Sequence, residues 1–224
     1  VLYNAAEFLE QKQLTPTVFV NSDFCFNGKV YYRTLEALLR SQGHGQDLKN
    51  TYRQAYGSLF DSEHTPRRLS KTHYQYTVTE RVVLDVWNRH FGRDMPKDIH
   101  MQRSDLSYLK NAGWECGVHT KSHPSLAALT LDQQDSEING CYSAMRQQGL
   151  NPIKFLSFPH GDYRFLNEHT YTWISEHKNW NACFALGGVN FSPNRTEWLR
   201  IPAKDVSLPD FTAQLKNDIR LSRD

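Results

Sequence analysis

The stretch Trp114–Leu126, WECGVHTKSHPSL, constrains the fold of this chain more than any other. Its first five residues are typical of a buried strand. His119 and His123 follow that strand with a spacing of four, and Pro124 comes next. Because proline disfavours helix at the residue before it, the chain must turn here. We expect one helical turn across Thr120–Ser122, which would point both imidazoles the same way.

Two neutral imidazoles at the end of a strand predict a metal site. Zinc, cobalt or nickel suits such ligands better than magnesium or calcium. The chain contains 10 histidines, so the spacing alone also fits solvated or core histidines, and that alternative stays open. The strand before the pair and the proline after it favour the metal site.

Further short apolar runs alternate with helical patterns along the chain. The runs that we interpret as strands are 17–20, 114–118, 152–158, 182–186 and 198–202. The segments with helical patterns are 2–12, 104–111, 130–148, 166–177 and a last helix from Ser207. This alternation predicts an α/β fold with a parallel sheet, whose functional residues gather at the carboxyl ends of the strands. The polar residues expected at that edge are Asp23, His119, His123, His160 and Arg200.

The connection between the first two predicted strands is longer than one crossover helix requires. Its residues 26–98 form a predicted helical insertion, with Thr77-x-x-Glu80 as an expected capping box. We expect a polar loop at Asn21–Lys29 before it. The insertion fits two interpretations, a rim or lid of a groove and plain helical packing.

Length and composition indicate one globular domain over residues 1–224. The net charge of +2 gives no sign of a nucleic-acid partner, and no apolar run has membrane-spanning length. The four cysteines form no CxxC motif, which argues against a zinc knuckle or a thioredoxin-like motif. Cys116 is expected to be a reduced core residue, while disulfides elsewhere stay open.

Three segments together resemble one family. HTKSHP resembles the H-[ST]-x-x-H-P metal motif of polysaccharide deacetylases, the NodB-homology or carbohydrate esterase family 4 group. FLSFPHGDYR is similar to the family's third motif, and LRIPAKDVSLPDF to its C-terminal segment. The resemblance implies a distorted, incomplete (β/α) barrel of about seven strands. It also implies metal-dependent removal of N-acetyl groups, and in second place O-acetyl groups, from a polysaccharide or oligosaccharide.

The resemblance also implies roles for individual residues. His119 and His123 would bind the metal, most simply zinc, with Asp23 as a candidate third ligand. His160 stands where the family's backbone N–H binds the oxyanion, and Pro159 and Gly161 beside it would contact the substrate.

The sequence also departs from the family's pattern. Ser157 replaces the usual arginine, so Arg200 is a candidate for that arginine's role. The two aspartates of the TFDDG motif would lie ahead of Val1, which predicts that the chain is N-terminally incomplete. The late leucine-x-histidine motif has no match, which leaves the general acid unassigned. A catalytically inactive carbohydrate-binding domain and an amidohydrolase of small cyclic amides therefore remain alternatives. A glycan substrate weakly favours the cell envelope or secretion over the cytoplasm.

Overall fold

The computed structural model describes residues 9–57, 60, 76–186 and 197–200. Their sheet has five parallel strands in the order of the sequence, so each strand lies beside the next one along the chain. The strands are β1 Thr17–Val20, β2 Glu115–Val118, β3 Phe155–Ser157, β4 Ala182–Leu186 and β5 Glu197–Arg200. An order that never reverses is that of a (β/α) barrel, whereas a doubly wound sheet reverses its strand order in the middle. The α/β prediction is confirmed, with a barrel that is incomplete in the described residues.

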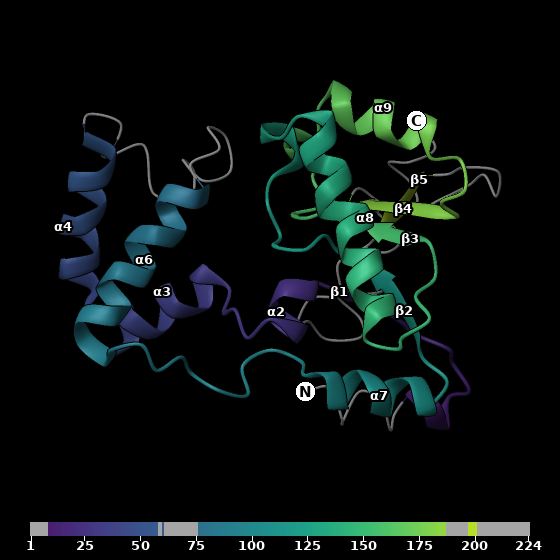
Figure 1. Cartoon of the computed structure of the whole chain (residues 1–224), viewed down its shortest axis with the longest axis horizontal. Coiled ribbons are helices and arrows are strands. Elements are labelled where there is room, and N and C mark those ends of the chain that lie inside the picture. Colours follow the sequence, from purple (N-terminus) through teal and green to yellow (C-terminus); the bar gives the residue numbers. More distant parts are fainter. Residues whose placement is uncertain (1–8, 58–59, 61–75, 187–196, 201–224) are drawn as a thin grey trace, which may run out of the picture.

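Helices connect the strands and cover the sheet. Those of the described residues are α2 Ser22–Phe26, α3 Tyr32–Ser41, α4 Gly45–Tyr56, α6 Tyr76–Phe91, α7 Arg103–Asn111, α8 Leu131–Gln147 and α9 Glu168–Glu176. Two short 3₁₀ helices, η2 Leu126–Ala128 and η3 Tyr163–Phe165, precede α8 and α9. Helix α8 follows β2 and packs against both β2 and α9 (Figure 1). None of the helices in this part of the chain is long and apolar enough to cross a membrane.

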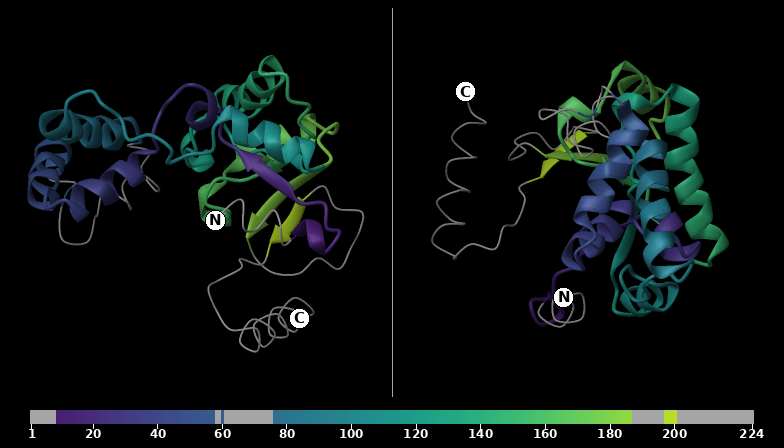
Figure 2. Two further views of the ribbon diagram at one scale, coloured as in Figure 1. Left: turned by 90° about the horizontal axis from the view of Figure 1, so that it is seen from below. Right: turned by 90° about the vertical axis from the view of Figure 1, so that its left-hand side faces the viewer.

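The buried apolar side chains form two separate clusters. The first lies between the sheet and its helices and includes Val118, Ile138, Leu156 and Trp173, all fully buried. The second joins α3, α4 and α6 and includes Leu35, Leu39, Leu48, Tyr52 and Val86. These three helices stand beside the sheet as a helical lobe with its own core (Figures 1 and 2). The lobe falls within residues 26–98, the predicted insertion.

Several local predictions can be compared with the structure. Thr130, the first residue of the predicted helix 130–148, caps α8, since its hydroxyl accepts from the N–H of Gln133 at 3.4 Å while the Gln133 side chain accepts from the N–H of Thr130 at 3.0 Å. The cap at Thr77 is wrong, because α6 already includes Tyr76. The predicted loop Asn21–Lys29 is wrong too: it contains α2, a short helix that buries Phe24 and Cys25.

The four cysteines are buried free thiols, so Cys116 is a reduced core residue as expected. The predicted last helix from Ser207 and most of the first, residues 1–8, lie outside the described residues.

Candidate active site

The carboxyl ends of three adjacent strands meet at one edge of the sheet. Asn21 follows β1, and its side-chain amide donates to the backbone carbonyls of His119 and, at 3.2 Å, Thr120. His119 follows β2, and its Nδ1 lies 2.6 Å from the carbonyl oxygen of Ser157, the last residue of β3. Side chains from one strand end thus bind the backbone of the next, which holds the three loops together.

Three histidines gather at this edge with two aromatic side chains around them. The ring centroids of His119 and His123 are 4.8 Å apart, and those of His123 and His160 are 4.7 Å apart. Phe165 packs against His160 at 4.9 Å, and Tyr31 packs against His123 at 5.2 Å. His123 is therefore at the centre of the cluster, in contact with residues from three different loops.

The loop between His119 and His123 is not the expected helical turn. Thr120 and His123 have φ angles of 68° and 60°, in the left-handed region that a continuing right-handed turn excludes. His160 also lies there, with φ 64°. Such conformations of non-glycine residues cost about 1–3 kcal/mol each and tend to occur at functional sites. The predicted helical turn is therefore wrong, although the two imidazoles do meet.

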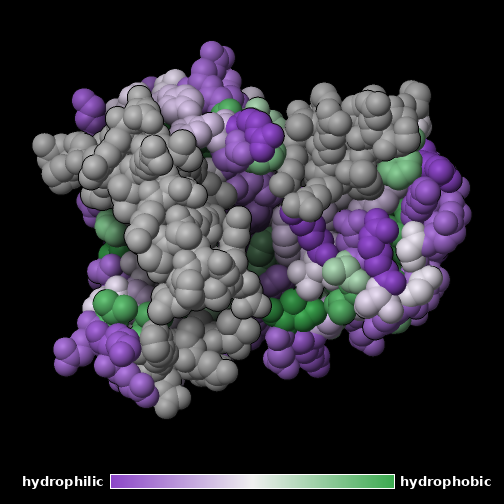
Figure 3. Space-filling view, turned by 180° about the vertical axis from the view of Figure 1, so that it is seen from behind, coloured by the Kyte–Doolittle hydropathy of each residue, from purple (hydrophilic) through white to green (hydrophobic). Residues whose placement is uncertain are grey.

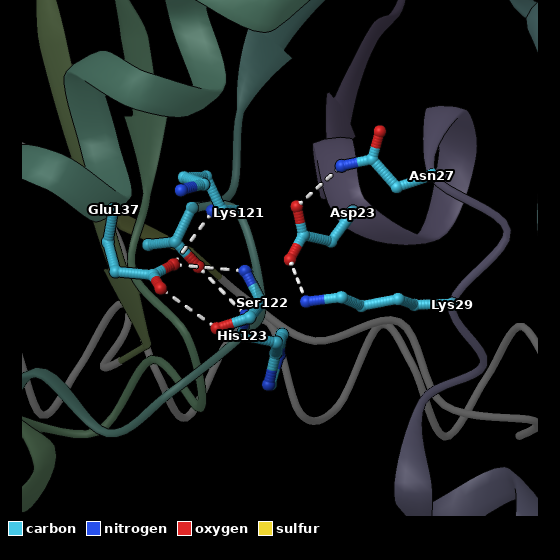
Figure 4. A network of polar contacts seen from close by, with 8 residues as sticks. Asp23, Asn27, Lys29, Lys121, Ser122, His123 and Glu137 are labelled. Atoms are coloured by element: carbon cyan, nitrogen blue, oxygen red, sulfur yellow. Dashed lines mark hydrogen bonds and ion pairs between the residues drawn. The ribbon is translucent and has the colours of Figure 1, made fainter.

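Glu137, on α8, holds this loop in its unusual conformation. Its carboxylate accepts hydrogen bonds from the backbone N–H groups of Lys121 and Ser122 and from the Ser122 hydroxyl, each at 2.9 Å (Figure 4). The hydroxyl of Thr120 in turn accepts from the N–H of His123 at 3.1 Å. Sequence reasoning missed Glu137, because a glutamate on an amphipathic helix carries no signal that distinguishes it from a solvated one.

The protonation of the two predicted ligands suits a metal. A carbonyl oxygen can only accept, so Nδ1 of His119 carries a proton, and the lone pair of the neutral imidazole is then on Nε2. Burial, followed by the neighbouring His119 and His160, lowers the pKa of His123 to about 2, so its imidazole is neutral. The Nδ1 atom of His123 is buried and has no hydrogen-bond partner in the described part of the chain. Metal-binding histidines commonly donate their second N–H to a backbone carbonyl, as His119 does.

Asp23, the candidate third ligand, lies beside the loop but is engaged elsewhere. Its backbone N–H donates to the carbonyl of Lys121 at 3.1 Å. Asp23 is buried, with an exposed fraction of 5 %. Its carboxylate accepts hydrogen bonds from Lys29 at 2.8 Å and from Asn27 at 3.0 Å (Figure 4). Within the described ranges, no three histidine, cysteine or acidic side chains are arranged to hold a metal. The role of Asp23 as a ligand stays a prediction.

The remaining predicted site residues lie after β3 and at the end of β5. Pro159 and Gly161 are buried on either side of His160, and Gly161 continues the left-handed turn with φ 71°. The structure thus brings the imidazole of His160 to the other two histidines, while its backbone N–H as an oxyanion donor stays a prediction. Arg200 ends β5 opposite Leu186, and its side chain lies outside the described part.

Comparison with known proteins agrees with the motifs. Residues 86–180 match a family model described as polysaccharide deacetylase, and this stretch contains all three histidines. Over this stretch, the match confirms the resemblance to polysaccharide deacetylases, the NodB-homology group, that the motifs predicted. The chain is also similar to the solved structure of the Streptococcus pyogenes deacetylase PplD in complex with acetate, with 16% identity and a TM-score of 0.45. That similarity covers 75% of this chain and 85% of that one. No curated protein matches the chain.

Proposed function

We propose that this protein removes N-acetyl groups from a polysaccharide or oligosaccharide with the help of a metal ion bound by His119 and His123. The observation that carries the proposal is the fixed tautomer of His119. Its Nδ1–H is held by the Ser157 carbonyl, so in the neutral imidazole the lone pair is on Nε2, on a ring that lies beside the neutral His123. Two neutral imidazoles favour zinc, with cobalt or nickel as substitutes. The family match supports a deacetylase.

Side chains and backbone groups of the protein would hold the reacting groups in position. A zinc ion would polarise the acetyl carbonyl and lower the pKa of a water molecule. The left-handed turn at His160 and Gly161 would aim the His160 N–H at the oxygen on which negative charge develops. Glu137 and Thr120 would keep the two ligand histidines in place through the loop backbone. We assign neither the general base nor the general acid among the described residues.

Acetate release tests the proposal. The purified chain, supplied with zinc, is incubated with an N-acetylated oligosaccharide, its O-acetylated counterpart and a small cyclic amide, whose ring opening is followed separately. We expect acetate from the N-acetylated glycan, loss of activity with a chelator, and loss in a His123→Ala variant. His169→Ala, a substitution on α9, is the matched control and should keep full activity. Full activity of His123→Ala, or hydrolysis of the cyclic amide alone, would exclude the proposed reaction.

A second candidate function is a carbohydrate-binding domain without catalysis. It is favoured by the absence, in the described residues, of a third side chain arranged to complete the metal site. Glycan binding by the chain with no bound metal and no acetate release would select it.

A further inference from the structure

The helical lobe has a core of its own and is joined to the rest of the molecule by two segments. In the described ranges, α3, α4 and α6 make their main contacts with one another rather than with any strand or with α7, α8 or α9. The chain enters the lobe through residues 27–31 and leaves it through residues 92–102, and neither segment contains a helix or strand. We call these two segments the neck. Units with separate cores move relative to one another unless the interface between them is large and apolar.

The neck is not closely packed. A cavity of about 410 Å³ lies there, and residues of both segments line it, among them Val30 and His100. Each segment also contains a glycine with a positive φ, Gly28 at 64° and Gly92 at 67°, and a Cβ at either position would meet no atom within 4 Å. Close packing is what makes protein interiors stiff, so the cavity leaves the neck room to bend.

A small aromatic group connects the neck to the histidine cluster. The backbone N–H of Tyr31 donates to Nε2 of His100 at 3.0 Å, which ties one segment of the neck to the other. Phe24 of α2 stacks on His100 at 5.2 Å and lies 5.5 Å from the Tyr31 ring. The Tyr31 ring in turn packs against His123 at 5.2 Å. A rotation of the lobe about the neck would therefore move the Tyr31 ring relative to the centre of the cluster.

The histidine cluster lies on the side of the sheet that faces the lobe. Strand β1 runs toward the lobe, and α2 at its end lies between the sheet and the lobe (Figure 2). Because all five strands are parallel, their carboxyl ends share this direction. Seen from behind, the surface is hollowed between the sheet part and the helical lobe (Figure 3). The lobe thus forms one wall of a cleft whose other wall carries the histidines.

We propose that the helical lobe is a hinged lid, which turns about the neck and closes on a glycan bound in the cleft at the histidine cluster. The inference rests on the proposed function only for the identity of the bound molecule. A glycan held between the two walls contacts both of them in the closed form alone, and this difference in affinity is what ligand-driven closure requires. Closure of such a lid excludes water from the reacting groups. The insertion would then be a lid rather than plain helical packing.

Distances between two spin labels, measured by pulsed electron paramagnetic resonance, test the lid. The four native cysteines are buried, so labels attach to cysteines introduced at exposed positions. Lys49→Cys on α4 and Thr172→Cys on α9 form the lobe pair. Ser107→Cys on α7, combined with the same Thr172→Cys, forms the matched control pair within the sheet part.

The free chain and the glycan-bound chain should differ. We expect the lobe pair to give a broader distribution of distances than the control pair in the free chain. An oligomer of N-acetylglucosamine, added with a chelator that prevents turnover, should narrow that distribution and shift it to shorter distances. The control pair should stay unchanged.

His100→Leu tests the neck itself. The variant removes the acceptor of the Tyr31 N–H and the ring on which Phe24 stacks. It should broaden the distribution of the lobe pair further in the free chain and leave the control pair as it was. If His100→Leu does not fold, the two pairs in the unmodified background decide.

The outcomes separate this inference from the proposed function. Narrowing of the lobe pair by the oligomer, without acetate release in the activity assay, would support the lid and exclude the deacetylase. Acetate release with a lobe pair that is as narrow as the control pair and unchanged by the oligomer would do the reverse. A broad distribution that the oligomer leaves broad would also overturn the lid, because the lobe would then move without closing on a glycan.

Discussion

The Nδ1 atom of His119 lies 2.6 Å from the carbonyl oxygen of Ser157, and this hydrogen bond joins the ends of β2 and β3. It fixes both the orientation and the tautomer of an imidazole that the sequence only marks as a candidate ligand. The strand pairing that puts Ser157 there thereby sets how the His119 ring is presented at the edge of the sheet.

Replacing His119 should remove the metal. In His119→Ala we expect metal content after dialysis to fall from near one ion per chain to a small fraction, because one imidazole cannot hold the ion alone. Acetate release should fall by about a thousandfold or more, since the main stabiliser of the developing charge is lost. Elemental analysis of both proteins is the measurement. Equal metal content in the two would place the ion elsewhere.

Glu137→Gln should loosen the loop that carries the ligands. The variant loses a carboxylate that accepts two backbone N–H bonds and one hydroxyl bond. We expect zinc affinity to fall about ten- to hundredfold, as for other residues that orient metal ligands. Glu176→Gln, an exposed substitution at the end of α9, is the control. Unchanged zinc affinity in Glu137→Gln, measured by competition with a chromophoric chelator, would show that the loop holds its shape without Glu137.

Gly117→Ala should destabilise the sheet. A Cβ at this position in β2 would lie 2.7 Å from the Phe19 ring of β1 and 3.1 Å from the carbonyl oxygen of Phe155. The ring can move but the backbone of β3 cannot, so we expect a loss of about 1–3 kcal/mol in the free energy of unfolding. Urea denaturation measures it. Gly45→Ala, whose Cβ would come no closer than 3.8 Å to another side chain, should leave stability unchanged or raise it.

We expect His100 to lower the free energy of unfolding as the pH falls. Burial lowers its pKa, and its Nε2 must stay unprotonated to accept the Tyr31 N–H. Below the unfolded pKa of about 6.5 the unfolded chain therefore binds a proton that the folded chain resists. The contribution of His100 to stability is complete above that pH and declines below it, by up to about 1.4 kcal/mol per pH unit, until the folded pKa is reached.

Urea denaturation between pH 7.5 and 5 compares His100→Gln with the unmodified chain. The variant should lose part of the pH dependence, while His169→Gln should retain it. Equal pH slopes in His100→Gln and the unmodified chain would contradict the assignment to His100.

The sheet and the ligand pair could be read from local patterns. Parallel strands are buried on both faces, so β1 and β4 appear as short apolar runs that need no partner to be recognised. The pair His119 and His123 was visible from its spacing and its proline. The residues that shape the site were not visible. Asn21 contacts the backbone of residues 98 and 99 positions away, and Glu137 contacts a loop 15 and 16 positions away.

The sequence by itself determined the strand–helix alternation, the family resemblance, and the two histidines on which the proposed chemistry depends. Each of these features depends on residues that are close together in the sequence. Only the tertiary structure decided the left-handed loop, the tautomer of His119 and the approach of Tyr31 to the cluster. These features depend on hydrogen bonds and packing between segments far apart in the sequence. Burial strengthens such hydrogen bonds, because the local dielectric constant is low. The physical reason is that local patterns specify secondary structure, whereas a site arises where several elements meet.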